Sequence, residues 1–189
     1  RSAPPAPITT ATPSDINVVC DMLLAAENPA IITEESGRTP EGYAALVELA
    51  ELLSIPVIEG RFSPYANFPK DHPLWIGAGR PPLVDEADLI LMIASRQPWY
   101  PLSNTPKKAR VVTIDETPFR DHVVYQPSSA ELFLEGDVAA NLALLVTALK
   151  AATIDSDAVA QRRAQRDEAA QARQAQNDTM ISDARAQST

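Results

Sequence analysis

Asp88-Leu89-Ile90-Leu91-Met92-Ile93-Ala94 is the stretch that decides the fold, because five large apolar residues follow one another in it without a polar interruption. Strands that are buried on both faces read as such runs, since helices cover both sides of a parallel sheet. The run has the length of a strand and is shorter than a typical buried helix. We therefore predict a central strand of a parallel sheet over residues 88–94.

Shorter apolar runs on both sides of this stretch predict further strands, over 30–33, 55–58, 110–114 and 132–134. Helices are predicted from an N-cap at Ser14 or Asp15 to Asn28, from Pro40 to Leu53, as one turn over 83–87, and from Asp137 to about Lys150. Strands that alternate with helices are typical of a doubly wound parallel sheet, and the right-handed crossover rule leaves few topologies. We predict a Rossmann-like α/β sheet of five or six strands.

Three regions differ in composition. Residues 1–13 contain four prolines, which remove backbone donors and fix φ, so an extended linker is predicted. Residues 14–150 carry the α/β domain, with a long irregular segment over 59–82; a loop of that length is usually functional or held by a partner. Residues 151–189 favour a helix but have few apolar positions, and such helices usually span between domains.

Composition excludes several classes of function. The net charge is −9 and no Lys/Arg cluster exists beyond Lys107-Lys108, which argues against nucleic-acid binding. No apolar run approaches the ~20 residues of a membrane-spanning helix, so we expect no membrane partner. Cys20 is the single cysteine and no signal-peptide pattern is present, so a cytoplasmic location is expected. Because the chain begins at Arg1 rather than Met, we expect an interior piece of a longer protein.

The loops that follow the predicted strands are the candidate binding site, because ligands of doubly wound sheets bind beyond the carboxyl ends of the strands. Serine, glycine and arginine can contact phosphates there, and a carboxylate can hold a ribose hydroxyl. Strand-end loops are polar in every such fold, so an ordinary surface is the alternative interpretation. The candidate nucleotide-binding residues are Ser36, Gly37, Arg38, Arg61, Ser95, Arg96, Asp115 and Glu116.

No pattern predicts catalysis or a metal site. Gly77-Ala78-Gly79 is followed by Pro82 where a dinucleotide fingerprint needs its third glycine. His72 and His122 have no His or Cys at the spacing of metal ligands, and the serines lack a nucleophile-elbow context. We therefore predict no catalytic residue and no metal ligand in this chain.

Six short sequence segments, called phrases below, follow one another in a distinctive order along most of the chain. They are Asn28-Pro29-Ala30-Ile31-Ile32, Ala50-Glu51-Leu52-Leu53-Ser54-Ile55-Pro56-Val57, Asn67-Phe68-Pro69-Lys70-Asp71-His72-Pro73-Leu74, Glu86-Ala87-Asp88-Leu89-Ile90-Leu91, Ala109-Arg110-Val111-Val112-Thr113-Ile114-Asp115 and Glu135-Gly136-Asp137. Their order and spacing resemble the central domain of thiamine-diphosphate-dependent enzymes of the acetolactate synthase and benzoylformate decarboxylase type.

The resemblance implies a non-catalytic part of a larger enzyme. In this family the first domain supplies a glutamate to the thiamine ring, and the third holds thiamine diphosphate and Mg²⁺ through a Gly-Asp-Gly motif. Here Gly136-Asp137 is followed by Val138, so that motif is absent. The implied role is a spacer and assembly surface between flanking domains, with 151–189 leading toward the cofactor-binding domain. The implied parent is a homodimeric or homotetrameric lyase or transferase that acts on 2-oxo acids.

Some members of the family carry FAD or ADP in the central domain. Their glycine-rich first loop is replaced here by Glu34-Glu35-Ser36-Gly37, and two adjacent carboxylates repel a phosphate. We expect no cofactor in this chain, with a vestigial FAD or ADP pocket as an open alternative. Two other hypotheses stay open: a stand-alone nucleotide-binding module, similar to electron-transfer flavoproteins or sirtuins, and an interaction domain whose tail docks a partner helix.

Overall fold

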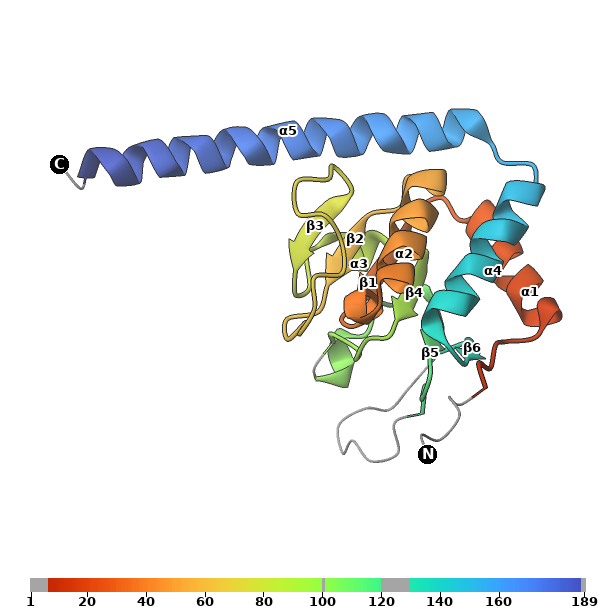
Figure 1. The fold of residues 1–189 in the computed structure, drawn as a ribbon. Coiled ribbons are helices and arrows are strands. Elements are labelled where there is room, and N and C mark those ends of the chain that lie inside the picture. The colour runs from red at the N-terminus through yellow and green to blue at the C-terminus, as the bar shows by residue number, and fades with distance from the viewer. Residues whose placement is uncertain (1–6, 100, 120–129, 188–189) are drawn as a thin grey trace.

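The computed structural model describes residues 7–99, 101–119 and 130–187 (Figure 1). Within them six strands form one parallel sheet in the order β3-β2-β1-β4-β5-β6, which confirms the predicted doubly wound α/β fold. The strands are β1 (Pro29–Thr33), β2 (Val57–Glu59), β3 (Trp75–Ala78), β4 (Leu89–Ile93), β5 (Arg110–Asp115) and β6 (Leu132–Glu135).

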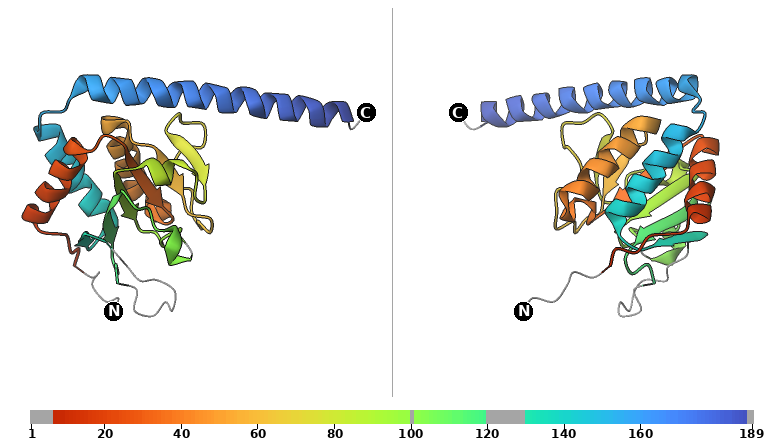
Figure 2. Two further views of the ribbon diagram at one scale, coloured as in Figure 1. Left: turned by 180° about the vertical axis from the view of Figure 1, so that it is seen from behind. Right: turned by 45° about the vertical axis from the view of Figure 1, so that its right-hand side comes forward.

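Helices cover the two faces of the sheet unequally (Figures 1 and 2). The long helices α1, α2 and α4 pack on one face, while α3 and the loop that contains Trp99 pack on the other. The helices are α1 (Pro13–Ala25), α2 (Pro40–Leu53), α3 (Leu83–Glu86), α4 (Val138–Ala151) and α5 (Ser156–Gln187), with short 3₁₀ helices η1 (Ser36–Arg38) and η2 (Leu102–Asn104).

Strand β4 lies at the centre of the sheet, between β1 and β5. All five of its residues are buried. Leu91 and its alternate neighbours face α1, α2 and α4, whereas Ile90 and Met92 face the Trp99 side. Burial on both faces is the physical reason why this stretch has no polar position. Asp88, just before the strand, accepts hydrogen bonds from the backbone N–H groups of Glu27 (2.7 Å) and Asn28 (3.0 Å), which ties the end of α1 to β4.

Strand β3 corrects the prediction that the whole of 59–82 is irregular. It pairs in parallel with β2 at the edge of the sheet, and its register shifts between Val57 and Ile58. The strand is short, half-exposed and interrupted by Gly77, whose φ is +123°, so it lacks the apolar run that marks the other strands. This edge strand buries too little surface, and has a glycine within it, to leave such a signature in the sequence.

The first helix begins at least two residues earlier than predicted, and with a different cap. Pro13 is its first residue, and Thr12 is the N-cap: the Thr12 hydroxyl accepts the backbone N–H of Asp15 at 3.2 Å. Neither Ser14 nor Asp15 caps the helix. Proline suits the first helical position because it has no N–H to satisfy there. The predicted linker over 1–13 is described from residue 7 on, and residues 7–12 form no regular element.

Helix α5 has 32 residues, which makes it about 48 Å long at 1.5 Å per residue. It crosses above the amino ends of the strands and continues past β3, as Figure 1 shows. Among the residues that the structure describes, no helix is both long enough and apolar enough to span a membrane.

Candidate functional site

The candidate residues meet where the topology predicts a crevice. The chain runs from β1 outward to β2 and β3, and then returns to β4 on the other side of β1. Loops that leave the carboxyl ends of β1 and β4 therefore diverge, and this switch point is where doubly wound folds bind ligands. Glu34 follows β1 here, and Ser95-Arg96 follow β4.

An ion pair between the buried Glu34 and the partly exposed Arg96 occupies this switch point. The Glu34 carboxylate, in a residue that is 4% exposed, accepts hydrogen bonds from Arg96 Nε (2.9 Å), Arg96 Nη2 (3.1 Å) and the Arg96 backbone N–H (3.0 Å). Its hydrogen bonds to Arg96 raise the pKa of that guanidinium above its usual range. The guanidinium also lies 5.5 Å from the centre of the Phe62 ring. Arg96 thus binds a carboxylate of its own chain in the geometry that it would need for a ligand phosphate.

In the loop after β1, the backbone N–H groups of residues 35–38 are all bonded within the protein, which leaves none of these four for a phosphate. In phosphate-binding loops of this kind of fold, consecutive N–H groups point at the ligand. Here all four N–H groups of residues 35–38 donate within the protein: Glu35 to Ala94 O (3.1 Å), Ser36 to Thr33 Oγ1 (3.4 Å), Gly37 to Asn67 Oδ1 (2.8 Å) and Arg38 to Glu35 O (3.0 Å). A ligand could use these donors only by displacing bonds that the fold already makes.

Asn67 organises this loop from the segment that follows β2. Its side chain is fully buried, and its Nδ2 lies within hydrogen-bond distance of Glu34 O (2.9 Å), Ser63 Oγ (2.6 Å) and Tyr65 O (3.0 Å). Its Oδ1 accepts the N–H of Gly37. A Cβ at Gly37 would lie 1.9 Å from the carbonyl oxygen of residue 66, so glycine is required by close approach of the two backbones.

The amino end of α2, a second place where a phosphate could bind, is partly occupied by the chain itself. Pro40, its first residue, has no N–H. The N–H of Gly42 donates to the Thr39 hydroxyl at 3.1 Å, and that of Tyr43 donates to Thr39 O at 3.1 Å. Thr39 therefore takes up two of the N–H groups at the helix end that binds anions in dinucleotide-binding folds.

Three further candidates, Arg38, Asp115 and Glu116, lie around a small cavity at the ends of β1 and β5. Arg38 forms an ion pair with Glu116, and Asp115 accepts the N–H of Thr117 at 2.8 Å. Arg61, after β2, is exposed on the same edge of the sheet. The cavity has a volume of about 170 Å³, below the roughly 300–1,000 Å³ of small-molecule sites. It is lined by Glu35, Arg38, Ala94, Asp115, Glu116, Thr117 and Val138.

Glu59, at the end of β2, belongs to a polar cluster that the sequence did not single out. It is 3% exposed, forms an ion pair with Lys70, and accepts hydrogen bonds from the Asn67 N–H (3.2 Å) and Trp75 Nε1 (3.4 Å). Burial lowers the pKa of Lys70. An isolated glutamate and a lysine eleven positions later carry no pattern, so only the folded chain reveals this cluster.

His72 orders a loop. Its Nδ1 accepts the N–H of Leu74 at 3.1 Å, its Nε2 lies 3.2 Å from Glu51 Oε1, and its ring meets Phe68 edge-on at 5.0 Å. His122 lies outside the described residues. Across the described ranges, no group of three or more His, Cys, Asp and Glu side chains is placed to hold a metal ion.

A comparison with models of protein families identifies the family of this chain. The chain matches the model of the thiamine pyrophosphate enzyme central domain over residues 16–145. The chain belongs to this family. The matched residues cover the described sheet and the helices α1, α2 and α3, together with the first half of α4.

Solved structures share the fold of this thiamine pyrophosphate enzyme central domain. A protein from Mycobacterium smegmatis assigned as a thiamin diphosphate-dependent enzyme superposes with a TM-score of 0.65 at 22% identity, over 82% of this chain and 31% of its own. Benzoylformate decarboxylase from Polynucleobacter necessarius gives a TM-score of 0.63 at 21% identity, over 78% of this chain and 29% of its own. The chain therefore spans under a third of the length of either protein.

Proposed function

We propose that this central domain is a non-catalytic spacer and assembly surface between the flanking domains of a thiamine-diphosphate-dependent enzyme. One observation carries the proposal. The N–H groups of residues 35–38 donate to acceptors within the chain, and the Arg96 guanidinium donates to Glu34. A doubly wound domain whose switch point is satisfied internally has lost the usual means of binding a nucleotide. What it retains is a stable shape on which other domains can be placed.

FAD and ADP do not fit the residues present. A diphosphate at the switch point would lie beside the Glu34 and Glu35 carboxylates, and their negative charge opposes it. It would also have to separate Glu34 from Arg96, which leaves a buried carboxylate without its partner, and that is costly. We therefore propose no flavin chemistry for this chain. The assignment of the candidate residues to nucleotide binding stays a prediction.

We place the catalytic chemistry of the parent outside this chain. The family match and the resemblance of the six phrases support an acetolactate-synthase-like parent, a lyase or transferase of 2-oxo acids. In that proposal thiamine diphosphate and Mg²⁺ are held by the flanking domains, and the parent is a cytoplasmic homodimer or homotetramer. Residues 1–13 and 151–189 are the connections to those domains, and 14–150 is the spacer.

Thermal unfolding of the purified chain tests this function. We expect the same melting temperature alone and with FAD, ADP or thiamine diphosphate plus Mg²⁺. A ligand at 100 times its Kd would stabilise the folded state by about 2.7 kcal/mol, or roughly 5–10 °C for a chain of this size. Stabilisation of that size by FAD or ADP would instead favour the stand-alone nucleotide-binding module. Stabilisation by thiamine diphosphate alone would contradict the proposal that the flanking domains hold this cofactor.

A further inference from the structure

One face of α5 packs on the domain, although the helix has only three large apolar residues, Val159, Met180 and Ile181. Half-buried positions recur every three or four residues along its first half and end at Arg173; from residue 174 on, the described side chains are exposed. Arg162, Arg166 and Arg173 share this face, because spacings of four and seven residues return to the same side of a helix. We call these three residues the arginine stripe. Its half-buried neighbours are Ala158, Val159, Arg163, Asp167 and Ala170.

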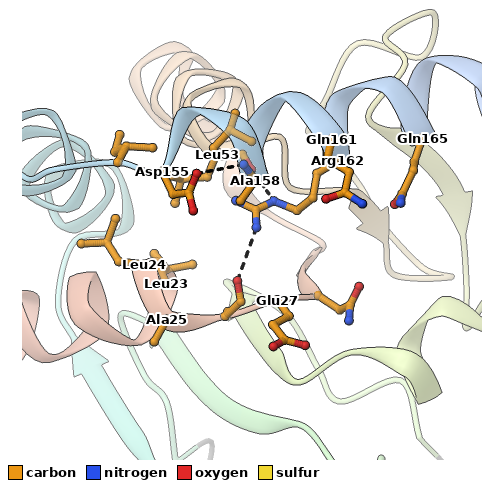
Figure 3. A pocket seen from close by; sticks show the side chains of 14 residues that line it. Leu23, Leu24, Ala25, Glu27, Leu53, Asp155, Ala158, Gln161, Arg162 and Gln165 are labelled. Atoms are coloured by element: carbon orange, nitrogen blue, oxygen red, sulfur yellow. Dashed lines mark hydrogen bonds between the residues drawn. The ribbon is translucent and has the colours of Figure 1, made fainter.

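Arg162 contacts the carboxyl ends of two other helices. Its Nε donates to Leu53 O, at the end of α2, at 3.1 Å, and its Nη1 donates to Ala26 O, the C-cap of α1, at 3.4 Å. Figure 3 shows the guanidinium reaching from α5 into the space between Leu53 and the last turn of α1. The last carbonyls of a helix have no intrahelical partner and carry a negative partial charge, so a guanidinium is well suited to bind them.

The other two arginines continue the contact along the amino edge of the sheet. Arg166 lies near Glu86 of α3, and its Nε is buried without a hydrogen-bond partner among the described residues. The Arg173 guanidinium lies 5.8 Å from the centre of the Trp75 ring in β3. Arg162 and Arg166 are half-buried, and this burial lowers the pKa of both guanidinium groups.

The interface between α5 and the domain combines the arginine contacts with one apolar contact, that of Val159 with the core, and it is incompletely filled. A cavity of about 440 Å³ lies on one side of Arg162, and a more open space of about 570 Å³ lies near Arg163 on the other. Water and salt can reach a contact of this kind, and charge–dipole attraction weakens as ionic strength rises. Such a contact holds a helix in place without making it a permanent part of the core.

We propose that the amino edge of the sheet is a docking surface for an arginine-bearing helix, and that the chain's own α5 is its occupant. Arg162 is the positioning residue, because its two hydrogen bonds fix where α5 begins to cross the sheet. The arginine stripe then sets the direction in which the exposed half of α5 leaves the domain. The docking of α5 does not depend on the proposed spacer function. Only the proposal that α5 leads to a flanking domain depends on it.

Amide hydrogen exchange on the full 189-residue chain tests the docking. In the unmodified chain, we expect the amides of residues 156–173 to be protected more strongly than those of 176–187. Arg162→Gln should reduce protection over 156–173 by about 10- to 100-fold, the effect of losing hydrogen bonds from a charged donor. Raising NaCl from 0.05 M to 0.5 M should lower the same protection. Amides of β1 and β4 report whether the fold is intact.

Arg185→Gln is the matched control. Arg185 carries the same charge on the same helix, and it is exposed in the half of α5 beyond the docked residues. We expect this variant to change the protection of 156–173 by less than about threefold, because exposed surface substitutions are usually worth less than about 0.5 kcal/mol. Equal effects of Arg162→Gln and Arg185→Gln would overturn the proposal. So would equal protection of the two halves of α5, or protection that falls on dilution, because the latter would mean docking on a second copy. None of these results changes the ligand-binding test of the spacer function.

Discussion

Asn67 shows how a single side chain can close a binding loop. It bonds the end of β1 through Glu34 O and the 3₁₀ turn through the Gly37 N–H, and it also holds its own loop through Ser63 and Tyr65. An amide can do this because it offers donors and an acceptor at one buried point. The geometry that makes the loop rigid is also the geometry that removes its N–H groups from any ligand.

Asn67→Ala should therefore destabilise the fold by about 2–3 kcal/mol, since buried donors and acceptors lose their partner. Urea unfolding followed by circular dichroism measures the difference. Asn17→Ala is the control, because Asn17 lies exposed on α1 and a surface change of this kind is usually worth less than about 0.5 kcal/mol. If the two variants unfold at the same urea concentration, Asn67 does not organise the loop.

The candidate residues could be placed by sequence, but their partners could not. Runs of apolar residues located the strand ends, and parallel strands bring those ends to one edge, so Arg38, Arg96 and Glu116 were expected near one another. Glu34 and Arg96 are 62 positions apart, and no local pattern links them. Asn67 lies in a segment without periodicity, so its role depends on how that segment folds back on β1.

At the scale of elements, the sequence predicts best those strands and helices whose apolar residues are buried. Strands β1, β4 and β5 were predicted to within about a residue because their apolar runs are continuous, as expected for covered parallel strands. The short apolar run of β6, at the other edge, was also sufficient. β3, at the edge, left no comparable run and was missed. For α5 the helix was predicted but its docked face was not, because the signal lies in arginines at helical spacing rather than in apolar residues.

The cap of α1 offers a direct test at this scale. Thr12→Ala should lower the free energy of unfolding by about 1 kcal/mol, because the N–H of Asp15 loses its acceptor. Ser14→Ala should have little effect or a slightly stabilising one, since Ser14 is exposed and lies inside the helix, where alanine is preferred. Thermal unfolding of both variants measures the contrast. A larger loss from Ser14→Ala would restore Ser14 as the cap.

At the scale of the whole molecule, the two ends of the domain lie at opposite edges of the sheet (Figure 2). Thr9 O accepts the N–H of Asp137, just after β6, so residues 7–12 run along the carboxyl edge. Gly136 permits this approach, because a Cβ there would lie 2.5 Å from Thr9 O. α5 lies across the amino edge. In the proposed spacer function, connections that leave from opposite edges of the sheet would keep the flanking domains apart.

The central claim is that the N–H groups of residues 35–38 are bonded within the chain, so that the domain separates flanking domains and does not bind a nucleotide. A titration of the ¹⁵N-labelled chain with ADP, followed through the amide signals of Glu35, Ser36, Gly37 and Arg38, tests it most directly. We predict that these four signals do not shift up to millimolar ADP, because their N–H groups stay bonded within the protein. Saturable shifts of these signals at lower ADP concentrations would contradict the claim, and would make the switch point of the sheet a nucleotide site.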